Sequence, residues 1–498
     1  MSVSSYIIEH MCDPRLADHF EPSDTDESRA LIEAMGAAGR AEARAAAARL
    51  EAIGKLFELR RVERGEEPEW AVDTWTAVGA EVAAALRISK AMAGSYMRYG
   101  LAMLERLPEV AAVFRAGDID YQTFQTIVFR TDLITDEQIL ARVDGQLALR
   151  VGRWPSMTRG RLSHAIDRVV AMADPDAMRR TREKADDRAV SIWDTDSGIS
   201  EVTGRLFTTD AHALSRRLDV LIATVCPNDP RTHNQRRADA LGALAAGADR
   251  LACRCESTDC TAAPAPASPV VIHVVADQAT AEGRNPAPGV VLGSDWLVPA
   301  EVIAELAKTA RLQPLIHPAD APPEAQYRPS AKLAAFIRAR DLTCRAPGCD
   351  VPASRCEVDH VIPWSEGGPT HASNLSCKCS THHLVKTFWG WRDRQLPDGT
   401  LIWTLPSGQT HVTTPGSTLL FPALCAPTGD LPSPAPTAGQ RCGDRTAMMP
   451  LRASTRAENR ARYIAAERHR NHQDRAAGVV PPADGSPPPD PDHDPPPF

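Results

Sequence analysis

Aromatic residues and long hydrophobic runs are both scarce in this sequence. Phe, Trp and Tyr make up 5% of its 498 residues, whereas alanine is abundant, and this composition indicates an Ala-rich helical body. No uninterrupted apolar stretch approaches the roughly 20 residues that a membrane-spanning helix needs, so we expect no membrane partner. The N-terminus has no basic start followed by an apolar run, which argues against a secretory signal and leads us to expect a cytoplasmic protein.

An excess of positive charge is also missing. The formal net charge is −8, which excludes a globally basic nucleic-acid binder, so any contact with nucleic acid must use a local patch. The length of 498 residues is more than one ordinary core accommodates, and it predicts two or three folded units. Many of the 41 prolines fall late in the chain, which predicts a disordered end.

The cysteines are clustered rather than spread along the chain. Eight of the twelve lie in two groups, at positions 253, 255 and 260 and at positions 344, 349, 356, 377 and 379. Clustering with interspersed histidines favours metal sites over a disulfide framework. The motif of Cys253, Cys255 and Cys260 is either a zinc site, with a fourth ligand such as His273 or Cys226, or a set of plain loop cysteines.

Shifts in composition divide the chain, and we expect a mainly α protein with small β elements. The expected parts are a disordered N-terminus (1–25), a mainly helical domain (26–317), a Pro-rich linker (318–329), a small Cys/His-rich domain (330–414) and a disordered Pro-rich tail (415–498).

Two helical segments have competing interpretations. A short helix over residues 81–86 and a longer one from Ser89 to Arg106 have the outline of a helix-turn-helix DNA reader, or they are packed core helices of an α-bundle. We favour the core interpretation, because this segment carries few basic side chains. Residues 455–474 predict a basic helix that contacts phosphate or docks, or else a solvated part of the tail, and we favour the solvated interpretation.

Alternating and β-branched stretches predict short strands. We expect one hairpin over residues 188–193 and 200–207, and another over residues 389–394 and 401–405. Between them, residues 270–276 read as a buried strand, with residues 290–292 and 315–316 as partners.

Two pairs of soft ligands lie in the central stretch of the chain. Cys344 and Cys349 form a C-x4-C pair, and Cys379 and His382 form a C-x2-H pair about thirty residues later. Four nitrogen and sulfur ligands that leave no position for water are typical of a structural zinc site. Cys377 is the alternative to Cys379, but its spacing to His382 makes a poorer chelate loop.

A second set of polar residues interleaves with the zinc-type ligands. Asp359 and His383 suit a hard cation such as Mg²⁺ or Mn²⁺, and His360 suits a general base. Lys386 lies about one turn after His383 on a predicted helix, where it can meet a phosphate, and Asn374 can brace the connecting loop.

This pattern, D-H…N…H-H-x2-K framed by C-x4-C and C-x2-H, resembles the HNH endonuclease family with its ββα-metal active site. The resemblance covers about residues 328–395 and implies that Asp359 and His383 bind the catalytic metal and that His360 is the general base. It also implies that Asn374 braces the loop, and that Cys344, Cys349, Cys379 and His382 hold zinc. His382 departs from the pattern, because cysteine is frequent at its position in the wider family.

The N-terminal part resembles another family. The stretches LRISKAMAGSYMRYG, LPEVAAVFRAGDIDYQTF and GRLFTTDAHAL are similar to the domain of unknown function 222, which precedes HNH modules in actinobacterial proteins that include the 13E12 repeat family. This resemblance implies an architecture and no activity for the helical domain.

Together these features predict a metal-dependent endonuclease that hydrolyses DNA. The helical domain would supply target binding or homodimerisation. The alternative is a non-catalytic, zinc-stabilised DNA-binding or scaffolding protein, although such a protein has no need for Asp359 or His360. A zinc hydrolase of small substrates is a third hypothesis, but its zinc needs an open position that four protein ligands do not leave.

Overall fold

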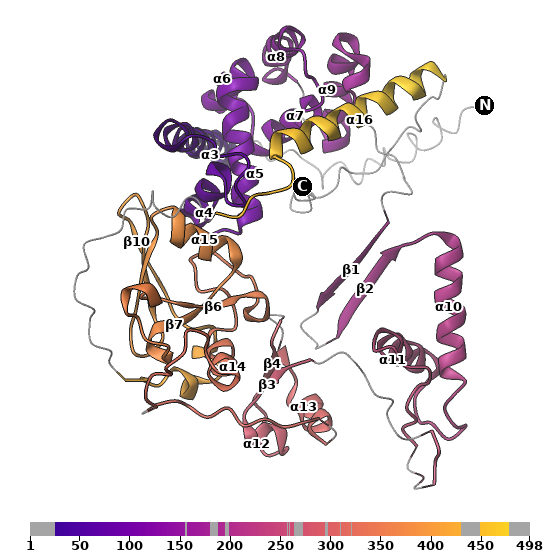
Figure 1. Cartoon of the computed structure of the whole chain (residues 1–498). Helices are drawn as coiled ribbons and strands as arrows, with labels where there is room; N and C mark the ends of the chain where they lie inside the picture. Colours follow the sequence, from indigo (N-terminus) through magenta and orange to yellow (C-terminus); the bar gives the residue numbers. More distant parts are fainter. Residues whose placement is uncertain are drawn as a thin grey trace. The chain divides into compact units, whose positions relative to one another are not determined.

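The chain folds into two compact units that we describe separately. The first unit comprises Met1–Gly79, Ala91–Arg180 and Leu451–Phe498, and the second comprises Ala80–Lys90 and Thr181–Pro450 (Figure 1). The predicted disordered residues 1–24, 430–448 and 478–498 lie outside the described residues. The computed structural model describes residues 25–154, 157–179, 188–194, 199–255, 257, 259–262, 272–293, 297–308, 310–319, 321–429 and 449–477.

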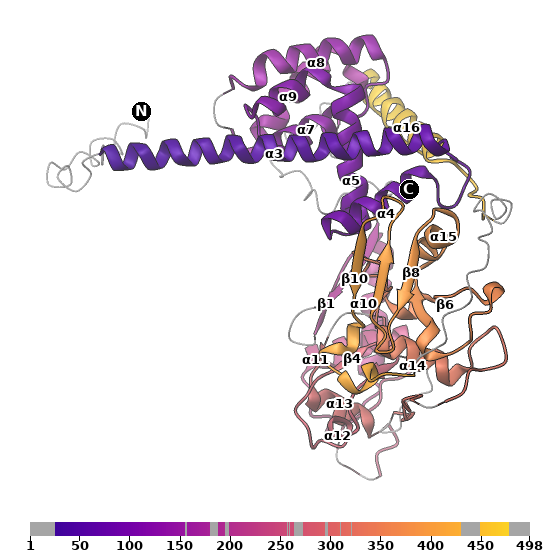
Figure 2. The same cartoon turned by 90° about the vertical axis from the view of Figure 1, so that its left-hand side faces the viewer.

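The first unit is built of helices, and Figure 2 shows the long α3 running past the shorter ones. α3 begins at a capping box in which Thr25 and Ser28 satisfy each other's backbone amides. Its helices are α3 (Asp26–Arg64), the start of α4 (Thr74–Leu86), α5 (Lys90–Leu101), the π-helical turn η1 (Ala102–Arg106), α6 (Pro108–Ala116), α7 (Tyr121–Thr131), α8 (Glu137–Val151), α9 (Arg159–Ala173), the 3₁₀ turn η2 (Pro175–Ala177) and α16 (Arg456–Ala476).

Two glycines let α3 and α5 cross at backbone distance. A Cβ built on Gly100 would lie 2.5 Å from the carbonyl oxygen of Leu50, and one on Gly54 would lie 3.0 Å from the carbonyl oxygen of Gly100. Any larger residue at either position would therefore push the two helices apart. Leu50 and Met97, which are fully buried, belong to the core around this crossing.

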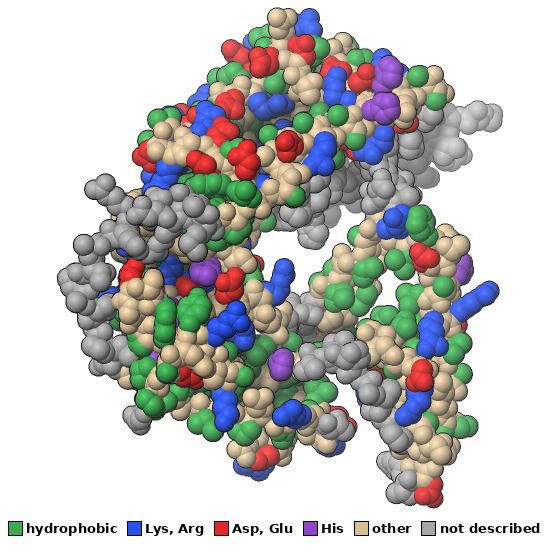
Figure 3. All heavy atoms as spheres, in the orientation of Figure 1, with side chains coloured by type: hydrophobic (Ala, Val, Ile, Leu, Met, Phe, Trp, Pro, Cys, Tyr) green, Lys and Arg blue, Asp and Glu red, His purple; other side chains and the backbone are tan. Residues whose placement is uncertain are grey.

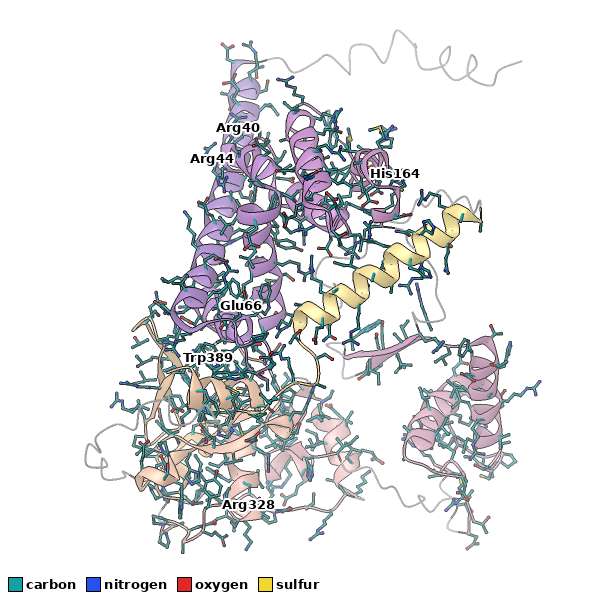
Figure 4. All side chains as sticks on the ribbon, turned by 45° about the horizontal axis from the view of Figure 1, so that its top comes forward. Arg40, Arg44, Glu66, His164, Arg328 and Trp389 are labelled. Carbon is teal, nitrogen blue, oxygen red and sulfur yellow. The ribbon has the colours of Figure 1, made fainter. Side chains whose placement is uncertain are left out.

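The basic helix α16 packs against the other helices of the first unit (Figure 4), so the favoured interpretation of a solvated helix is wrong. Its arginines, together with Arg452, pair with acidic side chains that are distant in sequence, which sequence periodicity alone does not reveal. The pairs are Arg456–Asp73 at 2.9 Å, Arg468–Asp174 and Arg475–Asp176 at 2.6 Å, Arg452–Asp73 at 3.2 Å and Arg460–Asp132. Acidic and basic side chains are accordingly interspersed over the visible face of this unit in Figure 3.

The turn between α4 and α5 belongs to the second unit. Arg87, with φ +56°, ends α4, and the predicted short helix 81–86 is the last part of this longer helix. The turn packs against the loop that carries Cys344 and Cys349, since a Cβ on Gly348 would lie 2.9 Å from the carbonyl oxygen of Ile88. Leu86, one of the residues expected in the core, is 36% exposed at the end of α4.

The amino-terminal part of the second unit contains the first predicted hairpin. Strands β1 and β2 pair antiparallel, with Ala189 opposite Arg205, and expose the apolar side chains of Val190, Ile192 and Val202 (Figure 3). The elements here are β1 (Ala189–Asp194), β2 (Ser200–Arg205), α10 (Thr208–Ile222), α11 (His233–Ala245), β3 (Val274–Val275), α12 (Gln278–Ala281), β4 (Gly289–Val291), β5 (Leu297–Val298) and α13 (Ala300–Ala307).

The small sheet β3-β4-β5 corrects one expected pairing. β3 pairs with β4 as expected, with Val274 opposite Val291, but residues 315–316 form no strand, and the third strand of the sheet is β5, which pairs with β4. Ile316 is 78% exposed, which is the opposite of what a buried strand requires. The pairing with β5 was difficult to predict because Leu297–Val298 is only two residues long.

The carboxy-terminal part of the second unit is a ββα arrangement beside a three-stranded sheet, which confirms the expected fold class. Strands β6 and β7 pair antiparallel, with His360 opposite Leu375, and α15 follows β7 at once. The elements are α14 (Ala331–Asp341), η4 (Ala353–Arg355), β6 (Glu357–His360), η5 (Trp364–Glu366), η6 (Ala372–Asn374), β7 (Leu375–Lys378), α15 (Ser380–Phe388), β8 (Arg392–Gln395), β9 (Leu401–Thr404), β10 (Thr410–Thr413), η7 (Gly416–Thr418) and η8 (Pro422–Cys425).

Three segments near this arrangement differ from the expected organisation. Strand β10, which no prediction included, pairs with β9 and completes the sheet. Residues 415–429, assigned to the tail, contain η7 and η8, and Phe421 is buried in a cluster with Ala339. Residues 318–329, assigned to a linker, contact the following segment, because Glu324 forms an isolated β-bridge with Thr370.

None of the described helices is both long enough and apolar enough to cross a membrane.

Candidate functional site

Strand β6 and helix α15 hold most of the predicted site residues. Alternation along β6 places Glu357 and Asp359 on one face of the strand and His360 on the other. Asp359 faces α15, where Lys386 and His383 lie, whereas His360 is turned inward and is 4% exposed. The two faces of one short strand therefore separate the acid from the neighbouring histidine.

The sequence-predicted soft ligands converge on one point. The sulfur atoms of Cys344, Cys349 and Cys379 and one ring nitrogen of His382 all lie within 4.8 Å of one another. His382 Nδ1 lies 3.3 Å from Cys379 Sγ and 3.6 Å from Cys344 Sγ, and Cys349 Sγ lies 3.9 Å from Cys379 Sγ. This group can hold one metal ion, and we call it the Cys/His group.

Neighbouring backbone and side chains hold the Cys/His group in place. The amide of Cys379 donates to Cys344 Sγ over 3.3 Å, and the amide of Cys344 donates to the carbonyl of Val351 over 2.7 Å. Lys90 Nζ lies 3.6 Å from Cys379 Sγ, where its positive charge offsets thiolate charge. The thiols of Cys349, Cys356 and Cys379 surround Cys344 and lower its pKa well below the ordinary thiol value, which favours metal binding.

The alternative ligand Cys377 lies outside the Cys/His group. Its side chain is buried, and its sulfur faces the carbonyl of Ile337 at 4.0 Å. Burial raises the pKa of this thiol well above the ordinary value, so Cys377 is a core residue.

Asp359 uses its two oxygens differently. Oδ2 contacts two ammonium groups, Lys386 Nζ at 2.9 Å and Lys378 Nζ at 3.1 Å. Oδ1 lies 3.4 Å from His383 Nε2. Burial alone would raise the pKa of Asp359, but Lys378 and Lys386 outweigh burial and hold the pKa well below its usual range. Asp359 is therefore an ionised carboxylate with one oxygen directed at His383.

Glu357 fixes the orientation of the His383 ring. Its Oε2 accepts a hydrogen bond from His383 Nδ1 over 2.6 Å. The proton of a neutral ring is thereby held on Nδ1, and the lone pair of Nε2 points towards Asp359 Oδ1. Asp359 Oδ1 and His383 Nε2 thus form a pair of converging donors for a cation.

His360 lies in an aromatic and hydrogen-bonded enclosure. Its ring stacks on Tyr327 at 5.3 Å between centroids and meets Trp364 edge-on at 5.8 Å. Its Nε2 lies 2.9 Å from the hydroxyl of Thr370. Burial lowers the pKa of His360 below the ordinary histidine value, so the ring is neutral near pH 7.

The Thr370 hydroxyl determines which nitrogen of His360 carries the proton. This hydroxyl donates its single hydrogen to the carbonyl of Gln326 over 2.7 Å. It must therefore accept from His360 Nε2–H, because a hydroxyl has only one proton to give. The neutral His360 ring then keeps its lone pair on Nδ1, which is the state that a general base needs.

Asn374 braces the loop between the two strands, as its position in the motif predicts. Its Oδ1 accepts from the amide of Ile362 over 2.8 Å, and its Nδ2 donates to the carbonyls of Ile362 and Pro369 over 3.1 and 2.9 Å. A Cβ on Gly368 would lie 1.9 Å from the carbonyl oxygen of Ile362, so the loop requires glycine there.

Lys386 makes its contacts inside the fold. Besides Asp359, its ammonium pairs with Asp393 at 3.1 Å and donates to the carbonyls of His360 and Val361. Figure 4 marks Trp389 at the end of the same helix. These contacts give Lys386 the task of holding Asp359 and the end of β6, in place of the phosphate contact expected from sequence.

Sequence reasoning missed several residues of this arrangement. Alternation along β6 already pairs Glu357 with Asp359, so Glu357 was within reach of prediction. Lys378, Asp393, Thr370 and Tyr327 were not, because strand pairing and a loop assigned to the linker bring them to the site. Lys378 is completely buried, with Nζ 2.9 Å from Asp393 Oδ2.

Comparison with known proteins agrees with this architecture. Residues 37–341 match the family described as domain of unknown function (DUF222), and residues 343–388 match the family described as HNH endonuclease. No solved structure matches the chain.

Full-length relatives occur in Mycobacterium tuberculosis. The uncharacterized protein Rv2100 of strain ATCC 25618 / H37Rv is 43% identical over 97% of this chain and 95% of its own length. The uncharacterized protein Rv3776 of the same strain is 44% identical over 95% of this chain and 97% of its own length. The chain therefore belongs to the family of DUF222 proteins, and in it this domain is followed by an HNH endonuclease domain.

Proposed function

We propose that this protein is a metal-dependent endonuclease that hydrolyses DNA phosphodiester bonds. The observation that carries this proposal is that two possible metal ligands, Asp359 and His383, converge beside a histidine, His360, that can act as a base. Asp359 Oδ1 and His383 Nε2 lie 3.4 Å apart on one face of β6, and the other face holds a neutral His360.

The converging donors suit a divalent cation. Two adjacent ligands of an octahedral Mg²⁺ or Mn²⁺ ion lie about 3.0 Å apart when each is about 2.1 Å from the ion. The separation of 3.4 Å between Asp359 Oδ1 and His383 Nε2 is close to this value. When bound, such an ion would offset charge on the phosphate and on the leaving oxygen.

The chain's own residues supply the proton transfer. His360 Nδ1 takes a proton from water as the water oxygen attacks phosphorus, the P–O3′ bond breaks, and the leaving O3′ oxygen takes up a proton from solvent. Asn374 holds the loop in shape, and Thr370 orients the His360 ring for this step. The products would carry 5′-phosphate and 3′-hydroxyl ends, as the HNH resemblance implies.

The Cys/His group supports the proposal as a structural zinc site. Sulfur ligands of a tetrahedral zinc ion lie about 3.8 Å apart when each is about 2.3 Å from the metal. The separation of 3.9 Å between Cys349 Sγ and Cys379 Sγ matches this value. Four protein ligands leave no position for water, so this ion would stabilise α15 and take no part in hydrolysis.

The segment that carries the site has a modest excess of basic residues. Residues 331–395 contain nine Lys or Arg and six Asp or Glu. Arg340, Arg345 and Lys378 are buried and paired with acids, so they do not reach DNA. The exposed Arg328, beside Tyr327, is a candidate phosphate contact on the loop before α14 (Figure 4).

The test is a plasmid-nicking assay with Mg²⁺ or Mn²⁺. The wild type should nick supercoiled DNA, and His360→Ala should lower the rate about 10²- to 10⁴-fold. His212→Ala, which replaces an exposed histidine on α10, is the matched control and should nick like the wild type. DNA ligase should reseal the nicks, because it requires 5′-phosphate and 3′-hydroxyl ends. Equal nicking by wild type and His360→Ala would refute the proposal.

The burial of His360 favours a second candidate, a non-catalytic zinc-stabilised DNA-binding or scaffolding protein. With 4% of its surface exposed beneath Tyr327, this histidine has little direct access to water. Wild-type protein that shifts DNA in a gel but leaves plasmid intact with either cation would establish the second candidate over the first.

A further inference from the structure

Four cysteines outside the HNH segment converge in the second unit. Cys226 follows the end of α10, and Cys253, Cys255 and Cys260 lie in the loop after α11. Their four sulfur atoms all lie within 4.8 Å of one another, and none of the four forms a disulfide. Cys226 Sγ and Cys253 Sγ are 3.4 Å apart, well beyond the bond length of about 2.05 Å in a disulfide. We call these residues the four-cysteine group.

Local hydrogen bonds hold the two chain segments of the four-cysteine group together. Arg231 pairs with Asp229 at 2.7 Å on one segment and donates to the carbonyl of Ala252 over 2.7 Å on the other. The amide of Arg254 donates to Asp229 Oδ2 over 3.0 Å. The amide of Cys253 donates to the carbonyl of Ala262 over 2.8 Å, which folds the loop back on itself. The sulfur atoms are therefore positioned by a specific framework.

Backbone amides also face the sulfur atoms. The amides of Asn228 and Ser257 donate to the sulfurs of Cys226 and Cys255, and the amides of Cys255 and Cys226 both donate to the sulfur of Cys253. These contacts fix the positions of three of the four sulfur atoms relative to the loop backbone.

The region around the four-cysteine group has little hydrophobic core of its own. Within the described residues, the cluster packed between α10 and α11 contains four buried members, Leu218, Leu221, Ala240 and Leu251. Small structural units with thin cores are commonly stabilised by a bound metal. The four-cysteine group lies at the end of this cluster, beside Leu251.

We propose that Cys226, Cys253, Cys255 and Cys260 bind a structural zinc ion, in addition to the ion of the Cys/His group. Four converging sulfurs suit tetrahedral zinc, and a full set of protein ligands leaves no position for water or substrate. The ion fastens the end of α10 to the loop after α11. This site lies in the DUF222 region, and it does not depend on nuclease activity.

The first experiment is elemental analysis of the full-length chain, purified without chelators. The wild type should contain two zinc ions per chain, because the two groups each hold one. Cys255→Ser/Cys260→Ser should contain one. Cys379→Ser should lose the other ion and keep that of the four-cysteine group. Cys425→Ser, which replaces a free cysteine outside both groups, is the matched control and should contain two.

Zinc-edge X-ray absorption identifies the ligands. Over its two ions the wild type should show seven sulfur and one nitrogen ligands, and Cys379→Ser should show only the all-sulfur site. Wild-type protein with one zinc ion, lost in Cys379→Ser but kept in Cys255→Ser/Cys260→Ser, would overturn the proposal. Iron in place of zinc in the four-cysteine group would overturn it too. Wild-type protein with a single zinc ion held by three sulfur and one nitrogen ligands would overturn the proposal without any variant, so a variant that fails to fold does not obscure the result.

Discussion

His382 and His383 are neighbours on α15, yet they belong to sites of opposite character. His382 is 1% exposed and lies among three cysteine sulfurs. The side chain of His383 is 30% exposed and lies between two carboxylates, Glu357 and Asp359. Adjacent positions on a helix point about 100° apart, so α15 presents one ring to each site. The resemblance to the HNH family implied this division of roles, and the geometry supports it.

The two sites differ in what keeps them assembled. The Cys/His group gathers thiols that need a metal ion to neutralise their charge, and Lys90 Nζ lies 3.6 Å from Cys379 Sγ. Asp359 already has its charge neutralised by Lys378 and Lys386. We infer that folding depends on the ion at the first site, whereas chemistry depends on the ion at the second.

Replacing the two histidines one at a time tests this comparison with the largest expected effect. His382→Ala should lose the zinc ion of the Cys/His group and with it a binding free energy on the order of 10 kcal/mol, which is enough to unfold the HNH segment. His383→Ala should keep zinc and the fold but lose nicking activity. The measurements are zinc content and tryptophan fluorescence, because Trp391 lies 6.0 Å from the His382 ring.

The opposite pattern would break the comparison. If His382→Ala melts at the wild-type temperature and nicks DNA, zinc does not support the site. If His383→Ala loses zinc, the two sites are not separate.

Replacing Lys378, which pairs with both Asp359 and Asp393, tests whether lysines hold the Asp359 carboxylate in place. Lys378→Met leaves two buried carboxylates, Asp359 and Asp393, with Lys386 as the remaining lysine that contacts both. Breaking a buried ion pair in this way costs about 3–5 kcal/mol. We expect urea unfolding to show a loss of this size, with zinc content unchanged in the folded protein. Lys332→Met, which removes an exposed lysine on α14, is the control. A loss no larger than that of the control would show that Lys378 is not needed to hold Asp359.

These lysines also show where sequence reasoning reached its limit. The spacing of Cys344, Cys349, Cys379 and His382 predicted the Cys/His group, because chelate loops are local in sequence. Helical periodicity predicted the helix that begins after Ser89 and the basic helix near the C-terminus, which are α5 and α16, and alternation predicted the hairpin of β1 and β2.

Contacts between distant segments were not predictable. Asp393 on β8 reaches Lys378 on β7 across two separate sheets, and the role expected for Lys386 changed once both acids were in place. Thr370 reaches His360 within a loop that also contacts residues 318–329, which composition had marked as a linker. Such partners depend on tertiary packing, which no local pattern encodes.

Removing the charge of Glu357 tests the proposed cation site that Asp359 and His383 form. Glu357→Gln keeps the size of the side chain but weakens its hold on His383 Nδ1. Losing an outer partner of a metal ligand typically costs about 10- to 100-fold in metal affinity or activity. We expect a correspondingly higher Mg²⁺ concentration at half-maximal nicking, with the rate restored at excess metal. Glu301→Gln on α13 is the control, and an unchanged Mg²⁺ requirement would remove Glu357 from the site.

The smallest effect concerns Thr370, which acts on the other face of β6. Thr370→Val preserves shape but removes the acceptor for His360 Nε2–H. A hydrogen bond worth about 1.4 kcal/mol corresponds to a roughly tenfold slower nicking rate. Thr370→Ser retains the hydroxyl and should restore most of the rate.

A double-mutant cycle with His360→Ala distinguishes two roles of Thr370, which are to orient the His360 ring and to support the loop. If Thr370 acts only by orienting the His360 ring, Thr370→Val should slow the wild type about tenfold but leave the residual rate of His360→Ala unchanged. If the threonine merely supports the loop through Gln326, both backgrounds should slow equally. Equal slowing would mean that Thr370 supports the same loop that Asn374 braces. The position of the proton on the neutral His360 ring would then not be set by Thr370.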